Sequence, residues 1–448
     1  MDFISKIKRG GGLLAVFAAV AVLAACVRPN DDNDEEYESQ VSGTYPVENV
    51  DKSHTWNLSS TYTITVRVSG SQLPEGVNRV QVLTADPTVS AAAEVASEAY
   101  VSAGDEVTLS YSVPFYDVQP DIFVAAVTAD DDYVIVGAPV GTSVVAFSGL
   151  VSKVSAPTNV KRQAFTYLFE DSFPDADDFD YNDIVMRIAF EPAANSNQLR
   201  MHVVLSGVGT KKQMAGMVNL TGVQYSEVAS VMIEDGGAMD ANYPLQRYMV
   251  SSSNTLIAGR GGQAVIRLFE DAHWAMLRKT NSLGGIQRAF INTTHTYQTE
   301  EDDDPSSFVQ MDSISRTYLI TFSTASARNR LSLATIDPFI MEFNSSICWE
   351  THTFQYKYLS TGQLTQVLTD INISNFPTDH YTWALCIPQS DFRYPVEGMT
   401  LGSYDNTNNI GAYFGAYNSS GHRFADWAMN RNNATDWYLY PTNVGLLY

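Results

Sequence analysis

The sequence predicts an all-β protein built from two β-sandwich-type domains. Apolar and polar residues alternate in short runs, as in TYTITVRVSG (61–70), where every second residue from Tyr62 to Val68 is apolar. Gly, Pro and Asp turns separate these runs. Long periodic helical segments are missing, and HRFADWAM (422–429) predicts one short helix. With 448 residues, of which 45% are hydrophobic, the chain can fill full-size cores.

The N-terminus has the pattern of an export signal. Basic residues within 6–9 precede an apolar run, 13–23, that is too short for a membrane span. Leu23-Ala24-Ala25-Cys26 then resembles the lipobox of bacterial lipoproteins. The resemblance implies a signal peptide over 1–25, cleavage before Cys26 and a lipid anchor on its thiol. The alternative is an ordinary secretory signal with a chance cysteine.

Residues 26–47 are polar and acidic, which predicts a disordered tether. The acidic run DDNDEE (31–36) resembles the surface-export signal of Bacteroidetes lipoproteins. That resemblance implies an outer-membrane protein facing the exterior, whereas the alternative is a spacer without an addressing role.

Two blocks of strand patterns follow the tether. VNRVQVLTAD, EVTLSYSV, DIFVAAVTA and DYVIVGAPV continue the first block and predict an Ig-like sandwich over 48–152. SKVSAPTN (152–159) has the composition of a linker, which we place at 153–162. The second block, 163–448, contains AFTYLFE, DIVMRIAFEP, QLRMHVVLSGVG, QAVIRLFE, RTYLITFST, PFIMEFN, THTFQYKYL and YTWALCIP, and predicts a larger all-β domain.

Charge and motifs narrow the function classes. The net charge of −23 repels nucleic acid, so we expect no nucleic-acid partner. The sequence lacks a G-x-S-x-G elbow and an H-E-x-x-H zinc motif, and we expect the protein not to be an enzyme. His273 and His380 each lie beside acidic residues, and we interpret both as surface or packing residues.

The most informative stretch is FEDSFPDADDFDYNDIV (169–185). Asp178, Asp180 and Asn182 alternate with Phe179 and Tyr181, so an extended chain would place the oxygens on one face. Calcium prefers six to eight such oxygens, and the spacing does not fit an EF-hand. The stretch predicts a structural calcium site, and the alternative is an acidic surface turn without metal. The candidate ligands are Asp178, Asp180, Asn182, Asp183, Glu170, Asp171, Asp175 and Asp177.

The same stretch resembles the FED…DxDxND signature of the LruC-type domain, a domain of unknown function in bacterial surface lipoproteins. VVLSGVGTKKQMAGMVNLTGV, DPFIMEFN, YTWALCIPQSDFRYPVEG, FADWAMN and DWYLYP are similar to the later landmarks of that domain, in order. The resemblance covers most of residues 165–440. It implies metal ligation at the Asp178–Asp183 stretch and gives no catalytic residues.

Cysteines and aromatic residues leave alternatives open. After processing, Cys348 and Cys386 are either a disulfide or two buried free thiols. The aromatic residues Trp383, Trp427, Trp437, Tyr438 and Tyr440 are either core residues or a platform for stacking sugars.

The sequence therefore predicts a lipid-anchored surface protein with a calcium-stabilised domain that binds a glycan or protein ligand, as in adhesion. A structural or accessory subunit of a fimbria-like assembly is the alternative. A carbohydrate-active enzyme is the least supported reading.

Overall fold

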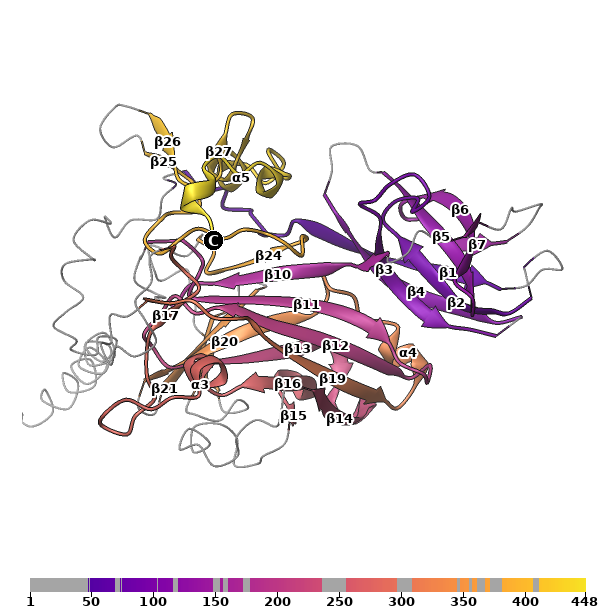
Figure 1. The fold of residues 1–448 in the computed structure, drawn as a ribbon, viewed down its shortest axis with the longest axis horizontal. Coiled ribbons are helices and arrows are strands. Elements are labelled where there is room, and N and C mark those ends of the chain that lie inside the picture. The colour runs from indigo at the N-terminus through magenta and orange to yellow at the C-terminus, as the bar shows by residue number, and fades with distance from the viewer. Residues whose placement is uncertain are drawn as a thin grey trace, which may run out of the picture.

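Strands dominate the fold, which confirms the predicted all-β class (Figure 1). The structure is a computed structural model. It describes residues 47, 49–68, 73, 75–102, 104–115, 120–147, 154–155, 160–171, 178–235, 255–295, 308–344, 347–353, 357–360, 367–370, 381–405 and 411–448. The predicted signal peptide, Cys26 and His380 lie outside these residues.

The N-terminal sandwich packs two sheets around one core. The first sheet has the order β4 (Glu106–Pro114), β1 (Ser59–Arg67), β7 (Val144–Ala146). The second has the order β8 (Val154–Ser155), β6 (Asp132–Pro139), β5 (Asp121–Thr128), β2 (Val77–Leu83), β3 (Glu94–Tyr100), β9 (Lys161–Arg162). The alternation in 61–70 is confirmed, because Ile64, Val66 and Val68 are buried in this core. The immunoglobulin-like topology stays a prediction.

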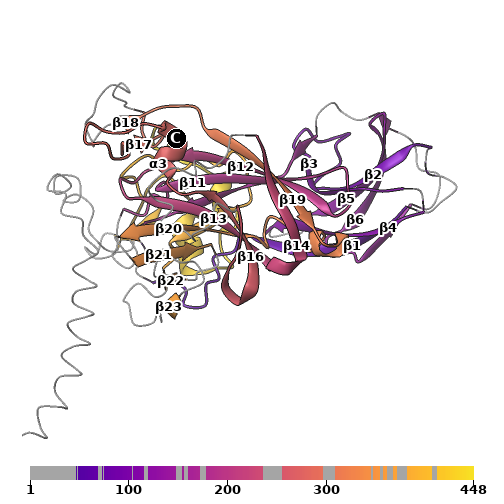
Figure 2. The same cartoon turned by 90° about the horizontal axis from the view of Figure 1, so that it is seen from below.

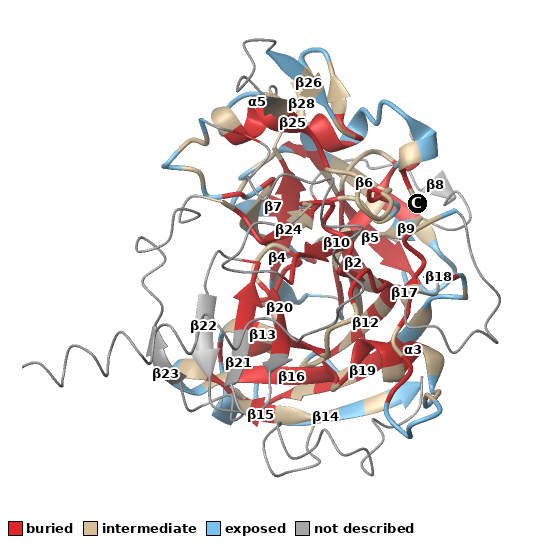
Figure 3. Ribbon diagram, turned by 90° about the vertical axis from the view of Figure 1, so that its left-hand side faces the viewer, coloured by how far each residue is buried: buried red, intermediate tan, exposed pale blue. Residues whose placement is uncertain are grey.

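The larger domain is a second sandwich. Its six-stranded sheet has the order β14 (Val228–Asp235), β19 (Ile314–Phe322), β12 (Gln198–Gly207), β11 (Ile184–Pro192), β10 (Ala164–Phe169), β24 (Ala384–Ile387). Its seven-stranded sheet has the order β15 (Leu256–Ala258), β16 (Gln263–Phe269), β13 (Met214–Gln224), β20 (Asp337–Asn344), β21 (Ile347–His352), β22 (Lys357–Ser360), β23 (Val367–Asp370). The largest core lies between these sheets, and Figure 3 shows its buried strands in red.

Short elements close the ends of the larger sandwich. They are η1 (Tyr225–Glu227), η3 (Arg260–Gly262), α3 (Ala272–Leu277), β17 (Phe290–Ile291), β18 (Phe308–Val309) and α4 (Ala325–Arg328). Among the described residues, no helix has the length and hydrophobicity needed to cross a bilayer.

Residues 392–405 and 411–448 form a third layer, here called the C-terminal cap. Its elements are β25 (Ser403–Asp405), β26 (Ala412–Phe414), β27 (Asn418–Ser419), β28 (His422–Arg423), α5 (Phe424–Met429), η5 (Trp437–Leu439) and η6 (Val444–Leu446). The helix α5 confirms the helix predicted at 422–429. A second core, which includes Leu168 and Val185 from β10 and β11, lies between the cap and the outer face of the six-stranded sheet.

The chain enters this second core before it forms the sandwich. Val47, Trp56 and Leu58 are buried there, and Val47 forms a parallel bridge with Tyr404. The sequence placed Val47 in the tether and the next residues in the sandwich. In the structure, Val47, Trp56 and Leu58 instead pack with residues at the far end of the chain.

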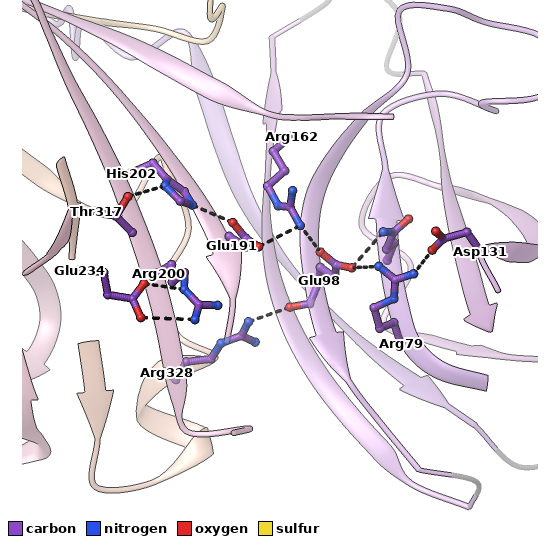
Figure 4. A network of polar contacts seen from close by, with 11 residues as sticks. Arg79, Glu98, Asp131, Arg162, Glu191, Arg200, His202, Glu234, Thr317 and Arg328 are labelled. Atoms are coloured by element: carbon purple, nitrogen blue, oxygen red, sulfur yellow. Dashed lines mark hydrogen bonds and ion pairs between the residues drawn. The ribbon is translucent and has the colours of Figure 1, made fainter. Parts of the chain in front are cut away.

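The two sandwiches meet through a polar interface, shown close up in Figure 4. The Glu98 side chain, only 3% exposed, accepts hydrogen bonds from Gln81, Arg79 and Arg162. Arg328 of α4 donates to the Glu98 backbone oxygen at 2.7 Å. Arg162, in the predicted linker, also lies 3.6 Å from Glu191 of β11 and so bridges the two domains seen in Figures 1 and 2.

Candidate metal site

The acidic stretch occupies the connection between two antiparallel strands of the six-stranded sheet, β10 and β11. Glu170 directly follows β10, and its backbone N–H donates to the Trp383 oxygen at 2.9 Å. Asp175 and Asp177 lie outside the described residues. The stretch therefore begins in the sheet and reaches the second core.

The described part of the stretch, 178–183, is not the extended strand that the alternation predicted. Phe179 and Tyr181 have φ values of 52° and 56°, in the left-handed region that bulky residues rarely adopt. Both side chains are fully buried in the core beneath the cap. Burial of two aromatic rings outweighs a backbone strain of about 1–3 kcal/mol per residue. Both rings are core residues, whereas the extended backbone assumed from the alternation is wrong.

Three carboxylates of the stretch converge. Glu170, Asp178 and Asp180 each offer one oxygen, and these oxygens lie within 4.8 Å of one another. Glu170 is fully buried and Asp180 is 2% exposed. Glu170 Oε1 accepts a hydrogen bond from the Tyr181 backbone N–H. The converging group consists entirely of hard oxygen donors.

Backbone donors hold Asp180 in this position. Asp180 Oδ1 accepts from the Asn182 N–H at 3.0 Å, and Oδ2 accepts from the Gly398 N–H at 2.9 Å. Gly398 has φ +71°, a conformation that glycine adopts without strain. Asp180 therefore connects the acidic stretch to the cap.

Electrostatics disfavour the charged form of Asp180. Burial raises the pKa of its carboxyl well above the ordinary value, and the negative charges of Asp178, Glu397, Glu170 and Asp183 raise it further. Glu397 was not among the sequence candidates, because it lies more than 200 residues away in a cap segment without an acidic pattern. A cation beside these groups would remove the repulsion.

Asn182 is a further predicted ligand in this turn. It is fully buried, and its Nδ2 donates to the Pro395 oxygen at 3.2 Å. Its Oδ1 is buried and accepts no hydrogen bond in the structure. An unsatisfied buried oxygen costs about 1–3 kcal/mol. The amide oxygen of Asn182 is thus a further potential metal ligand in the same turn, and it accepts no hydrogen bond.

Asp171 and Asp183 have other contacts. The Asp171 N–H donates to Asp183 Oδ2 at 2.7 Å. The Asp171 carboxylate lies 2.9 Å from Lys212 Nζ and accepts from the Thr210 hydroxyl. Neither residue belongs to the converging group of three. Lys212 itself was missed, because nothing in GVGTKK signals which carboxylate it contacts.

A comparison with known protein families gives one match, which covers most of the larger domain. The family described as "Domain of unknown function (DUF4842)" matches residues 196–438. This range is more than half of the chain. The chain belongs to the DUF4842 family. The DUF4842 match begins after the acidic stretch but includes its partners Lys212 and Gly398. The resemblance to the LruC-type domain stays a prediction.

One solved structure is similar to this DUF4842 chain. It is a crystal structure described as a "putative lipoprotein" from Bacteroides ovatus, and it shares 13% sequence identity with a TM-score of 0.38. The match covers 83% of this chain and 99% of that chain. Among curated proteins, no sequence match is found.

The cysteine and histidine candidates of the DUF4842 chain lie away from the converging carboxylates or outside the described residues. Cys386 carries a free thiol in the structure, and burial raises its pKa to about 12. The alternative of a disulfide with Cys348 stays a prediction. The side chain of Cys348 lies outside the described residues. His273 is fully buried and contacts the Ala289 oxygen at 3.1 Å, which agrees with a packing role.

The aromatic platform is wrong for four of its five members. Trp383, Trp427 and Trp437 are at most 1% exposed, and Tyr438 is 3% exposed. They fill the core beneath the cap. Tyr440 alone is exposed, at 39%, and its ring stacks on His422 with centroids 3.8 Å apart.

Proposed function

We propose that the protein is a lipid-anchored protein of the outer membrane, facing the exterior, whose larger domain binds one calcium ion. The ion holds the C-terminal cap in place, and the cap presents a binding surface for a glycan or protein ligand. The converging carboxylates of Glu170, Asp178 and Asp180, of which Glu170 and Asp180 are buried, carry this proposal.

The donor chemistry fits calcium. Calcium takes six to eight oxygen ligands in irregular geometry, whereas magnesium demands an octahedron and zinc prefers nitrogen and sulfur. Glu170, Asp178 and Asp180 would supply the charge, and Asn182 would supply an amide oxygen. When bound, the ion supplies positive charge that stabilises the ionised carboxylates.

Contacts of the acidic stretch link the ion to the cap. Asp180 accepts from Gly398, and the Leu401 N–H donates to the Phe179 oxygen at 3.0 Å. Phe179 and Tyr181 pack into the core that the cap covers. Without an ion, repulsion among the carboxylates opposes this packing. With the ion, the stretch and the cap stabilise each other.

Exposed apolar side chains support a binding role for the cap. Four large hydrophobic side chains on it are exposed by 39–65%: Phe414, Leu439, Tyr440 and Val444. Exposed aromatic and aliphatic groups of this kind are common in recognition surfaces. Figure 3 shows the exposed outer side of the cap in pale blue. The lipobox-like Cys26 and the acidic tether support the anchor and the outward orientation.

Thermal unfolding of residues 27–448 tests the calcium part of the proposal. The midpoint is measured in EDTA and then across a calcium titration, with magnesium as the control ion. We expect a saturable rise with calcium. In Asp180→Asn the rise should vanish, because the variant lacks the carboxylate charge and one of the two oxygens.

The matched control is Asp312→Asn, which changes an exposed acidic residue. It should respond to calcium like the wild type. No midpoint shift up to about 5 mM calcium, beyond the weak range of extracellular sites, would contradict the proposal. An Asp180→Asn protein that still responds would place the ion elsewhere.

A further inference from the structure

The chain that leads from the proposed anchor enters the folded molecule at the C-terminal cap. Val47 is buried in the core beneath the cap and forms a parallel bridge with Tyr404 of β25. Further along, the Asp51 N–H donates to the Ala428 oxygen of α5 at 2.9 Å. Twenty residues separate Cys26 from Val47. A chain of that length spans about 25 Å as a flexible coil and at most about 70 Å when stretched. The anchor therefore limits how far the cap can lie from the membrane.

An exposed aromatic side chain lies close to this entry point. Tyr404, which forms the bridge with Val47, also pairs with Tyr413 of β26 on its other side. Neighbouring strands lie about 4.8 Å apart, so β26 lies about 10 Å from Val47. The last residue of β26, Phe414, is 45% exposed. Figure 1 shows β25 and β26 at the top of the view, away from the sheets of the larger sandwich.

The other exposed apolar side chains of the cap lie beside the end of β26. The Thr442 N–H and hydroxyl both donate to the Ala416 oxygen, at 3.0 and 2.8 Å. This contact holds the last part of the chain against the segment that follows β26. Tyrosine rings with aliphatic neighbours are typical of surfaces at the headgroup level of a membrane. Four side chains of this region are exposed by 39–65%, and we call them the apolar patch: Phe414, Leu439, Tyr440 and Val444.

Two arginines of the cap carry charge that no carboxylate neutralises directly. The cap contains three arginines and four acidic residues, so it is close to neutral in a chain of net charge −23. Arg393 Nη2 donates to the Val444 oxygen at 3.2 Å and to the Leu447 oxygen at 3.0 Å. Arg431 Nη1 donates to the Ser53 oxygen at 2.6 Å. In the described part of the chain, both guanidinium groups thus donate to backbone oxygens and not to carboxylates. Such guanidinium groups suit phosphate, which arginine binds strongly.

We propose that the C-terminal cap docks on the membrane that carries the anchor. The apolar patch lies at the level of the lipid headgroups, and Arg393 and Arg431 contact phosphate groups of glycolipids. This inference rests on the proposed function, because it requires the anchor at Cys26. It identifies the ligand of the cap as a glycolipid surface.

The tether makes a weak contact sufficient for docking. The net charge of −23 repels anionic headgroups, but salt screens this repulsion beyond about 8–10 Å. Docking of an anchored chain is intramolecular, and a short flexible linker supplies an effective concentration in the millimolar range. The apolar patch then needs only a modest affinity for the membrane. Docking also determines which side of the molecule faces away from the membrane.

Fluorescence of a polarity-sensitive dye on the full-length lipidated protein tests the proposal. The dye is attached to the introduced thiol of Val444→Cys, at the most exposed position of the apolar patch, and unsubstituted protein sets the background. The protein is reconstituted into vesicles of phosphatidylcholine and lipopolysaccharide. We expect a blue shift of the dye at position 444 and its quenching by spin-labelled lipid. The same dye on Val89→Cys, an 83% exposed site of the N-terminal sandwich, should show neither effect.

Matched variants separate docking by the patch from general adsorption. Leu439→Ser in the labelled protein should remove most of the blue shift. Leu283→Ser, which changes a 93% exposed side chain outside the cap, should leave it unchanged. Arg431→Gln should lower the ratio of docked to undocked protein about fivefold, because one cation near the phosphates is lost. Arg67→Gln in β1 is its control, and an equal loss in either control variant would overturn the proposal.

The outcomes distinguish the docking from the function on which it rests. Protein that floats with the vesicles but shows no blue shift at position 444 overturns the docking and leaves the anchor intact. Protein that does not float with the vesicles lacks the anchor, and this result overturns both. A blue shift that free polysaccharide from lipopolysaccharide produces in residues 27–448 would make the ligand a soluble glycan and would also overturn the docking.

Discussion

A glycine beside the acidic stretch offers a sharp test of how this stretch is held. Gly209 lies in the turn after β12, and its N–H donates to the backbone oxygens of Asn182 and Asp183 at 3.0 and 3.1 Å. A Cβ at position 209 would lie 1.7 Å from Asn182 Oδ1 and 2.9 Å from the Asn182 backbone oxygen. Ordinary carbon–oxygen contacts begin at about 3.3 Å.

Gly209→Ala should therefore displace the Asn182 side chain and break its hydrogen bond to Pro395. Overpacking of this kind costs about 1–3 kcal/mol, and the lost hydrogen bond costs about 1 kcal/mol more. We expect the free energy of unfolding of the larger domain to fall by about 2–4 kcal/mol. The assay is urea unfolding followed by tryptophan fluorescence, since four buried Trp residues lie in the core beneath the cap.

A double-mutant cycle separates the clash from a general effect. In an Asn182→Ala background the Oδ1 contact is gone and only the 2.9 Å backbone contact remains, so Gly209→Ala should cost less than half as much. Gly285→Ala, which meets only a flexible side chain at 3.4 Å, is the control and should change little. Equal costs in both backgrounds, or a cost below about 1 kcal/mol in the wild type, would refute the reasoning.

Two further predictions concern polar groups elsewhere. Glu98→Gln should lower the free energy of unfolding by about 1–2 kcal/mol, because a buried partner of Arg79 and Arg162 loses its charge; urea unfolding checks this, with the exposed Glu106→Gln as a near-neutral control. Burial lowers the pKa of His352, but Asp337 and Glu350 outweigh this and raise it above 6.5. Its stabilising charge is therefore fully present below pH 6.5 and is lost as the pH rises through the folded-state pKa. His352→Gln should remove that part of the pH dependence, and an unchanged stability–pH curve in the variant would contradict it.

Sequence patterning predicted those parts of the fold that local alternation determines. The run that begins at Tyr62 lies on a strand with one buried face, so its period of two translates directly into β1. The same reasoning failed at Phe179 and Tyr181. Both residues have a left-handed backbone conformation, and their rings fill the core beneath the cap. A period of two in the sequence cannot distinguish this arrangement from a strand.

The other differences between the predicted and the observed fold arise from contacts between residues that are far apart in the sequence. Val47 and Trp56 look like the edge of a tether, yet they pack with a cap some 350 residues later in the chain. THTFQYKYL looks like one strand, whereas its residues divide between the end of β21 and the start of β22. The sequence identified Glu170, Asp178 and Asp180 as candidates but not Glu397 or Lys212, because only the tertiary fold brings these beside the acidic stretch.

Calorimetric titration of calcium into metal-free protein tests the central claim most directly. The account predicts one ion per chain, with a dissociation constant of about 10⁻⁴–10⁻³ M or tighter, and no binding heat in Asp180→Asn. Magnesium should bind more weakly or not at all. Absence of calcium binding by the folded wild type, or unchanged binding by Asp180→Asn, would contradict a calcium site built from Glu170, Asp178 and Asp180.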